Sequence, residues 1–505
     1  MMRAHLPILP ILIPFAAALL QMAWPRLAWQ RAIGLAATVL LLLASAWLTA
    51  LCDDGLLRVY ALGDWPAPYG IVLVVDRLAA MMTLLCAILG LATLLYASAG
   101  FDARGQHFHP LFQLQLVGLC GAFLTGDLFN LFVFFEVMLL ASYTLLAHGG
   151  GLARTRAGIS YVVLNLIGSA LFLIALGLLY GTLGTLNLAD MASRLTQPGH
   201  DAALARIAFA LLIAVFALKA GLLPLSFWLP PTYGAAGAPV AALFAIMTKV
   251  GIVAILRVQA VALAPAMPDL LTGWLTTLAL ATIVFAALGA LTADRLRALA
   301  AWLVLLSAGS LLLVPAATDE RVVAAAIYYL LQSTLIGAAF FLVAGLIAVQ
   351  RGGCGDDFRA GPPTATWVKL AFLVVAASSA GLPPFAGFVG KLMLLTALRQ
   401  TAAGTATWIV LLGAGFLVMA ALARQGCILL WKPPLERAPQ PAAAVTWQQA
   451  TATLLLVAAA PLLAILAGPL SDYAQRTAGQ LQAPGAYVAG VLGAQAAATG
   501  NGVRR

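Results

Sequence analysis

Four ionisable side chains lie inside long apolar stretches of the sequence. Glu136 has at least four apolar residues on either side, and Lys219, Lys249 and Lys391 lie within other apolar stretches. An ionised side chain at the middle of a bilayer costs roughly 2.5–3.5 kcal/mol on insertion scales, so such residues are usually functional. Because burial disfavours the charged form, these groups are suited to taking up and releasing protons. The pattern predicts a buried proton relay.

Two of the lysines lie beside prolines. Lys219 precedes Pro224 by five residues, and Lys391 follows Pro383 and Pro384. A proline inside a helix removes a backbone donor and kinks or breaks the helix. Within a membrane, carbonyl groups and water gather at such a break, so we expect a broken helix beside each lysine.

A sequence echo relates the two proline regions. Residues 220–222 read Ala-Gly-Leu before Pro224, and residues 380–382 read the same before Pro384. Paired Gly and Pro interruptions at corresponding positions are typical of repeat-built transporters with broken helices at their sites.

A polar face lies in sequence between Lys249 and Lys391. It contains Tyr328 and Gln332, which share a helix face at i, i+4 spacing, and also Ser333. Such groups can hold a file of water. Gln332 cannot titrate, so it could order water or a cation but could not store a proton. An interhelical hydrogen bond is the structural alternative for Gln332.

Structural roles remain open for the charged residues as well. Glu136 could form an ion pair with a lysine of a neighbouring helix, and Lys219 could reach the interface along its stem. Lys249 and Lys391 could serve helix packing through hydrogen bonds to the backbone. Four further ionisable residues lie near segment ends, where interfacial solvation explains them: Asp76, Asp127, His148 and Arg257.

The composition places these residues in a membrane. Of 505 residues, 63% are hydrophobic and only 9% are charged, whereas soluble domains carry about 25% charged residues. The apolar residues come in long runs rather than alternating, which predicts an all-α integral membrane protein and excludes a barrel. Cutting at charge and turn signals gives about fourteen transmembrane helices, near 6–24, 32–52, 70–98, 109–125, 128–147, 157–181, 204–230, 238–264, 271–292, 296–315, 321–349, 366–398, 405–431 and 448–468.

An even number of spans puts both termini on one side of the membrane. The loops on the opposite side carry more Lys and Arg, which predicts non-cytoplasmic termini. The whole chain, 1–505, is expected to be one polytopic membrane domain, because polar connections such as 53–69 are too short to form a soluble domain. We divide it into N-terminal helices (1–108), a first repeat (109–264), a second repeat (271–431), and a last helix with a tail (432–505) that is loosely ordered or pinned by a partner.

No cofactor or metal site is indicated. The five cysteines are scattered without metal-binding spacing. The net charge of +10 lies mostly in short connections and forms no basic stripe with aromatic residues, so we expect no nucleic-acid partner.

The stretch from Gly126 to Val137, continuing to Tyr143, closely resembles the D-type component of Mrp-type (also called Pha or Mnh) multisubunit cation/proton antiporters. The resemblance extends through Lys219 to Pro224, Trp228-Leu229-Pro230, Thr248-Lys249, and from Gly381 through Pro384 to Gly387-Phe388 and Lys391, which is nearly all of the chain. That family is similar to the antiporter-like proton-pumping subunits of complex I.

The resemblance implies fourteen helices, inverted repeats with broken helices near Pro224 and Pro384, and a buried chain of Glu136, Lys219, Lys249 and Lys391. Related subunits often carry a histidine or lysine in the segment where this chain has Gln332 and Gly337. The central link of the relay therefore departs from the family pattern.

The leading interpretation is a secondary transporter and not an enzyme. It is one subunit of a hetero-oligomeric exchanger in a bacterial cell membrane, in which proton entry drives Na⁺ or K⁺ out. The alternative is a proton-pumping membrane subunit of an NADH:quinone oxidoreductase or a membrane hydrogenase. A stand-alone carrier is also open, whereas a membrane transferase is disfavoured because no acidic or His cluster lies at a membrane face. The exported cation, the stoichiometry, and whether this subunit moves the cation as well as the proton remain open.

Overall fold

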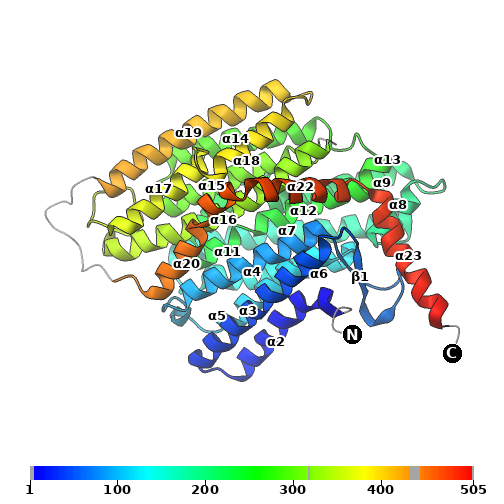
Figure 1. Cartoon of the computed structure of the whole chain (residues 1–505), viewed down its shortest axis with the longest axis horizontal. Coiled ribbons are helices and arrows are strands. Elements are labelled where there is room, and N and C mark those ends of the chain that lie inside the picture. The colour runs from blue at the N-terminus through cyan, green and yellow to red at the C-terminus, as the bar shows by residue number, and fades with distance from the viewer. Residues whose placement is uncertain (1–4, 317–318, 432–443, 503–505) are drawn as a thin grey trace.

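The protein is a bundle of long helices, shown in Figure 1. The computed structural model describes residues 5–316, 319–431 and 444–502. The helices of the N-terminal part of the chain are α2 (Leu9–Ala23), α3 (Leu27–Cys52), α4 (Arg77–Ala97), α5 (Phe108–Leu124), α6 (Leu128–Ala147), α7 (Leu152–Leu183), α8 (Leu188–Leu195) and α9 (Ala202–Ala220).

The middle of the chain continues the bundle. Its helices are α10 (Leu229–Ala235), α11 (Ala238–Phe244), α12 (Met247–Val258), α13 (Ala264–Ala266), α14 (Trp274–Thr292), α15 (Leu296–Leu312), α16 (Glu320–Arg351), α17 (Thr366–Ala380) and α18 (Ala386–Leu398). A π-helix, Gln259–Leu263, joins α12 to α13. The last helices are α19 (Gly404–Leu430), α20 (Trp447–Val457), α21 (Ala459–Ile465), α22 (Ala467–Leu481) and α23 (Pro484–Gly502).

Eleven helices in the described ranges are long and apolar enough to cross a membrane. Four shorter apolar helices, α5, α15, α17 and α18, lie among them. The all-helical membrane class is thus confirmed, but the predicted number of fourteen spans is not. The two numbers differ because the sequence segments included short helices, and because the segment 366–398 is divided here between α17 and α18.

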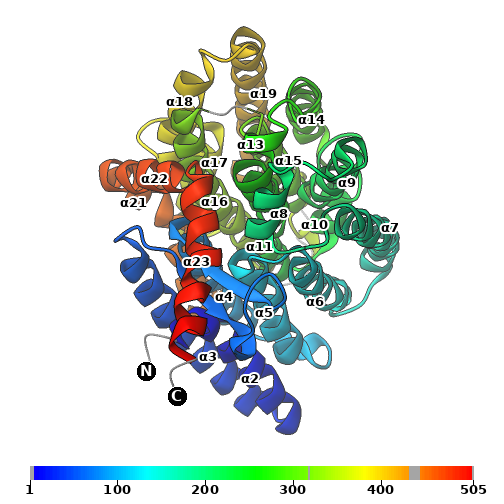
Figure 2. The same ribbon diagram turned by 90° about the vertical axis from the view of Figure 1, so that its right-hand side faces the viewer.

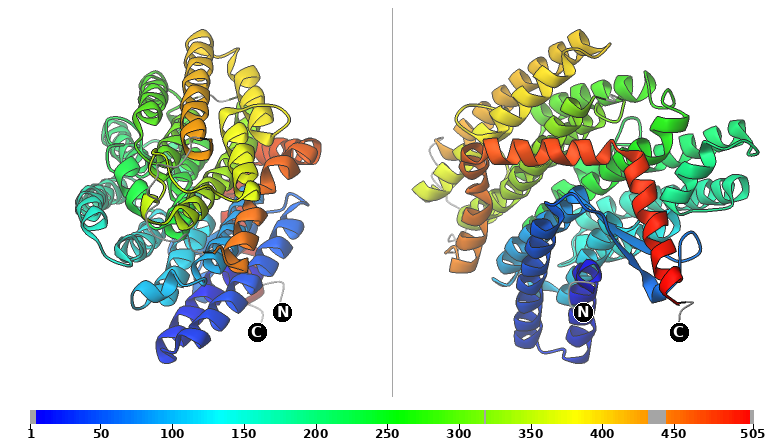
Figure 3. Two further views of the ribbon diagram at one scale, coloured as in Figure 1. Left: turned by 90° about the vertical axis from the view of Figure 1, so that its left-hand side faces the viewer. Right: turned by 45° about the vertical axis from the view of Figure 1, so that its right-hand side comes forward.

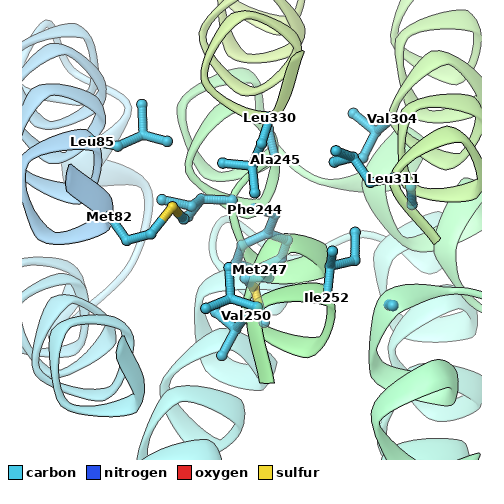
Figure 4. Close-up of a cluster of buried hydrophobic side chains, with 14 of the residues drawn as sticks. Met82, Leu85, Phe244, Ala245, Met247, Val250, Ile252, Val304, Leu311 and Leu330 are labelled. Atoms are coloured by element: carbon cyan, nitrogen blue, oxygen red, sulfur yellow. The ribbon is translucent and has the colours of Figure 1, made fainter. Parts of the chain in front are cut away.

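The centre of the bundle is built by α11, α12 and α16. In the most apolar stretch of Ala238–Ala266 every residue is buried. In the corresponding stretch of Gly404–Leu430, at the periphery, only 28% of the residues are buried. Figure 4 shows this centre, where Met82 of α4, Phe244 of α11, Val250 of α12, Val304 of α15 and Leu330 of α16 converge. Lys249 belongs to α12, so its ammonium group must be accommodated inside this apolar core.

The two proline regions have closely similar helix ends. α9 ends at Gly221 (φ +86°), and the Leu222 N–H donates to the Ala217 carbonyl. α17 ends at Gly381 (φ +85°), and the Leu382 N–H donates to the Ala377 carbonyl. Both are Schellman caps, which need a residue with positive φ and therefore favour glycine. The Ala-Gly-Leu echo thus encodes one backbone motif used twice.

A hairpin and a helical tail cover one end of the bundle. Strands β1 (Arg58–Ala61) and β2 (Val72–Val75) pair antiparallel, with Arg58 opposite Val75. The sequence analysis predicted no strands here: β1 lies in the polar connection 53–69, and β2 lies inside the segment 70–98 that was predicted to be a membrane span. In Figures 1 and 2, α23 and the start of α2 lie at the same end as the hairpin.

The tail was expected to be loosely ordered or pinned by a partner, and in the part that the structure describes it is helical and packs on the chain itself. α22 buries Ala474, Thr477, Ala478 and Leu481, which form one stripe at helical spacing. Gln480 accepts a hydrogen bond from the Arg77 N–H, and Tyr473 donates to the Arg77 carbonyl. Figure 3 shows α22 turning into α23 across the bundle.

Buried ion pairs tie the helix ends together. Arg257 of α12 donates two hydrogen bonds to Asp76, the N-cap of α4, at 2.5 and 2.9 Å. Asp76 is 3% exposed and Arg257 is 7% exposed, so interfacial solvation, which we expected for both, is the wrong explanation. Burial alone would raise the pKa of Asp76, but Arg257 and the Ala79 N–H lower it below its usual value.

A second cluster anchors the N-terminal helices. Asp102 accepts two hydrogen bonds from Arg31 of α3, at 2.7 and 2.8 Å, and lies 2.9 Å from Nε2 of the buried His109 of α5. Burial opposes ionisation of Asp102, but the bonds from Arg31 and His109 outweigh it and lower its pKa to about 2. The carboxylate therefore stays charged at neutral pH.

Replacing Arg257 by Gln should destabilise the protein strongly, by roughly 3–5 kcal/mol, because it leaves the buried Asp76 carboxylate unpaired. The matched control is Arg206→Gln, since Arg206 also forms a two-bond ion pair, with Asp269, but both side chains are largely exposed. The measurement is the unfolding midpoint of each purified variant in the same detergent. Equal midpoints for the two variants would contradict a stabilising role of the Asp76–Arg257 pair.

Candidate functional site

Lys219 lies in the last turn of α9, directly before the glycine cap at Gly221. Its side chain is 5% exposed. The ammonium donates to the backbone and side-chain oxygens of Asn165, both at 3.3 Å, and to Ser169 Oγ at 3.4 Å. Asn165 and Ser169 are one turn apart on α7, so one helix face supplies all of these acceptors.

Glu136 approaches this cluster from α6. Ser169 Oγ donates a short hydrogen bond to Glu136 Oε1. Ser169 therefore contacts both the carboxylate and the lysine. It joins Glu136 and Lys219 in place of the direct ion pair that the sequence analysis gave as the structural alternative. Glu136 is half-buried, and Val133 and Leu140 on the same helix are exposed.

Lys249 is fully buried in α12 and donates to Ser307 Oγ of α15 at 2.9 Å. Met247 and Val250 of the same helix belong to the apolar cluster of Figure 4, whereas Thr248, directly before the lysine, is polar and buried. α12 also packs very closely on α9, because a Cβ at Gly251 would lie 2.7 Å from the Phe216 carbonyl oxygen. This close approach brings the helices of Lys219 and Lys249 together, although no hydrogen bond joins the two lysines.

A small cavity lies between the partner of Lys249 and the last lysine. Its volume is about 30 Å³, which is enough for a water molecule, since such a site needs at least about 10–15 Å³. Its polar lining includes Ser307, Gln332, Ser333, Ser378 and Lys391. The Ser378 hydroxyl is buried and finds no hydrogen-bond partner among the described residues. A water molecule in this cavity would lie among Ser307, the hydrogen-bond partner of Lys249, and Ser378 and Lys391.

Lys391 extends from α18 back to the end of α17. Its ammonium donates to the carbonyl oxygens of Ser379 and Ala380, at 2.8 and 2.9 Å. These are terminal carbonyls of a helix, where the negative end of the helix dipole favours a cation. Lys391 also lines a larger cavity of about 410 Å³ that extends between α18 and α19 to Trp408 and Phe416.

The structure places the other predicted residues at three different positions. Gln332 and Ser333 face the small cavity together with Tyr329. Tyr328 instead donates to the Leu463 carbonyl of α21 at 2.9 Å and does not line that cavity. The prolines follow the helix ends: Pro224 lies between α9 and α10, and Pro383 and Pro384 lie between α17 and α18.

Sequence reasoning missed the neutral partners of the charged groups. Asn165, Ser169, Ser307 and Ser378 are short polar residues inside apolar segments. The i, i+4 spacing of Asn165 and Ser169 was a usable signal, because it places two polar groups on one face of an otherwise apolar helix. Ser307 had no such signal. In the described ranges, no group of three or more His, Cys, Asp or Glu side chains could hold a metal ion.

Comparison with known proteins supplies the family context. Residues 125–419 match the family model described as "NADH:quinone oxidoreductase/Mrp antiporter, TM". A curated relative from Rhizobium meliloti (strain 1021), the D component of a probable K(+)/H(+) antiporter, is 40% identical and covers 97% of this chain and 98% of its own length. The D component of a Na(+)/H(+) antiporter from Bacillus subtilis (strain 168) is 35% identical over 96% of this chain and 99% of its own.

Solved structures agree with this placement. A chain of the Mrp complex from Dietzia sp. DQ12-45-1b superposes with a TM-score of 0.88 at 27% identity, covering 97% of this chain and all of that chain. A chain of respiratory complex I from Thermus thermophilus superposes with a TM-score of 0.76 at 25% identity, covering 95% and 99%.

Replacing Ser307 by Ala should cost about 1.5–3 kcal/mol, because the buried Lys249 ammonium loses its hydrogen-bond acceptor. The matched control is Ser310→Ala on the same helix, where the buried hydroxyl donates to the Leu306 carbonyl of its own helix. Unfolding midpoints in detergent would measure the difference. Equal destabilisation by the two variants would mean that the bond to Lys249 contributes nothing.

Proposed function

Since this chain belongs to the NADH:quinone oxidoreductase/Mrp antiporter membrane family, we propose that it is the D-type component of a multisubunit antiporter that exchanges Na⁺ or K⁺ for H⁺. In this proposal protons pass through Glu136, Lys219, Lys249 and Lys391. The protein works as one part of a secondary transporter in a bacterial cell membrane, with both termini outside the cytoplasm.

The observation that carries the relay is the contact of Ser169 with both Glu136 and Lys219. A hydroxyl both donates and accepts, so it can pass a proton between a carboxylate and an amine that do not touch. Ser307 and the small cavity offer the same kind of connection between Lys249 and Lys391. The close packing of α9 and α12 at Gly251 supports transfer from Lys219 to Lys249 within the first repeat.

Two repeats, 109–264 and 271–431, carry equivalent sites in this proposal. Its support is the pair of matched Schellman caps, one just after Lys219 and one that Lys391 contacts. Each break supplies polar backbone beside a lysine within the membrane, which is where irregular backbone is tolerated.

Partner subunits are part of the proposal. Glu136 is half-buried on a helix that exposes Phe129, Val133 and Leu140. A carboxylate that faces lipid is costly, so a neighbouring subunit should cover this face. The relatives are named as antiporter subunits, and the matched structures are multisubunit complexes.

A redox-driven pump is the alternative function, because chains of a membrane-bound sulfane sulfur reductase and of complex I share the fold. These chains superpose with TM-scores of 0.85 and 0.76 at 25% identity, against 0.88 at 27% for the chain of the Mrp complex. The curated relatives at 35–40% identity over nearly the whole chain are antiporter components, and they favour the antiporter. The relatives are named for K⁺ in one case and Na⁺ in the other, so both ions are candidate substrates.

Replacing Glu136 by Gln or Lys219 by Ala in the assembled complex should abolish cation-dependent proton flux, because each change removes one titratable end of the Ser169 bridge. The measurement is Na⁺- or K⁺-induced pH change in inverted vesicles, with assembled protein quantified. Glu320→Gln is the control, since Glu320 lies at the start of α16 and accepts a hydrogen bond from the exposed Gln475. Wild-type flux in either relay variant would refute the relay, and proton pumping without a cation requirement would favour the redox pump.

Gln332→Leu should cut transport strongly, because it removes a polar wall from the cavity that separates Ser307 and Lys391. Gln332→His should preserve transport, since it restores a titratable group. Lys391→Ala should be inactive in either background. The same vesicle assay applies. Normal transport by Gln332→Leu, combined with loss in Lys391→Ala, would show that the proton reaches Lys391 by another path.

A further inference from the structure

A large crevice opens on the opposite side of α16 from the relay cavity. Its volume is about 840 Å³, and it lies between α3 and α4 on one side and α20, α21 and α22 on the other. Figure 2 shows α21 and α22 projecting on the same side of the bundle as α3. The walls are almost wholly apolar, with Met81, Leu85, Leu331, Leu456 and Leu463 among them.

One end of the crevice is charged. Arg476 of α22 donates to Asp53 at 2.8 Å, and both side chains are about half exposed, at 50% and 49%. Three other polar groups of the lining are already engaged. Thr49 donates to the Ser45 and Ala80 carbonyls, Tyr328 donates to the Leu463 carbonyl, and Tyr473 donates to the Arg77 carbonyl. A guanidinium and a carboxylate therefore remain accessible at the mouth.

We propose that this crevice binds a zwitterionic aminophospholipid of the phosphatidylethanolamine class. An acyl chain occupies the apolar walls, the phosphate is bound by Arg476, and the ammonium is bound by Asp53. The inference does not depend on the transport proposal, because it rests on the shape and charge of a separate surface.

The size and lining of the crevice suit an acyl chain with a small polar headgroup. Sites for small amphipathic ligands have about 300–1,000 Å³ and combine apolar walls with a few polar groups. The crevice has both properties.

The charges at the mouth favour a zwitterion over an anionic lipid. A phosphate binds a guanidinium well, but a headgroup with negative charge alone would also meet the Asp53 carboxylate. Arg77 donates to the Asp53 backbone carbonyl at 2.6 Å and lies 3.9 Å from its carboxylate, and so it holds this residue in place. An ethanolamine headgroup offers a cation for the carboxylate and an anion for the guanidinium, within one molecule.

The test is native mass spectrometry of the purified, delipidated complex titrated with phosphatidylethanolamine and, separately, with phosphatidylglycerol. The wild type should bind the first at least tenfold more tightly. Arg476→Glu should weaken its binding about tenfold, and Asp53→Asn should shift the preference toward phosphatidylglycerol. Leu331→Trp should also block binding by filling the crevice, without changing the charges.

Arg206→Glu is the matched control, because Arg206 belongs to a similarly exposed ion pair that does not line the crevice. It should bind lipid like the wild type. Equal binding of the two lipids by the wild type, or undiminished binding by Arg476→Glu, would overturn the proposal. Loss of another subunit from the complex in Leu331→Trp would also overturn it, since the crevice would then hold a protein segment.

Discussion

The fold is governed by the need to solvate three ammonium groups inside an apolar bundle. A lysine without oxygen acceptors at this depth would cost several kcal/mol. The chain meets this need with neutral oxygens: Asn165 and Ser169 for Lys219, Ser307 for Lys249, and helix-terminal carbonyls for Lys391. The helix ends at Gly221 and Gly381 supply polar backbone beside the first and the last of these lysines.

The ends of the bundle carry the charges that hold this interior in place. Asp76 links the start of α4 to the far end of α12, the helix of Lys249. Arg297 of α15, the helix of Ser307, donates to Asp356 at 2.8 Å. Because both ion pairs fix helices of the proposed relay, the positions of Lys249 and Ser307 depend on contacts far from either residue. The ion pairs at the helix ends therefore help to position the buried lysines and their partners, which make few hydrogen bonds themselves.

The sequence predicted the membrane class, the charged residues and the proline regions, because each produces a local signal: long apolar runs, isolated charges and helix breakers. It could not predict which neutral side chain meets which lysine, since Ser307 and Ser378 look like ordinary helix residues until helices distant in sequence pack together. The Asp76–Arg257 pair was misjudged for the same reason. A residue near the end of a segment looks solvated unless one knows that α22 and α23 cover that end. The hairpin was missed because its strands are too short to show a pattern.

The kind of partner decides what each lysine can do. A lysine that donates only to hydroxyl or carbonyl oxygens can lose its proton without leaving an unpaired carboxylate. Lys249 and Lys391 are of this kind. Lys219 differs, because Ser169 links it to Glu136. The first lysine is thus the one whose hydrogen bonds can respond to a movement of the carboxylate. Glu136 lies half-buried at the surface of the chain, so in the proposed assembly a partner subunit would contact the same carboxylate that Ser169 links to Lys219.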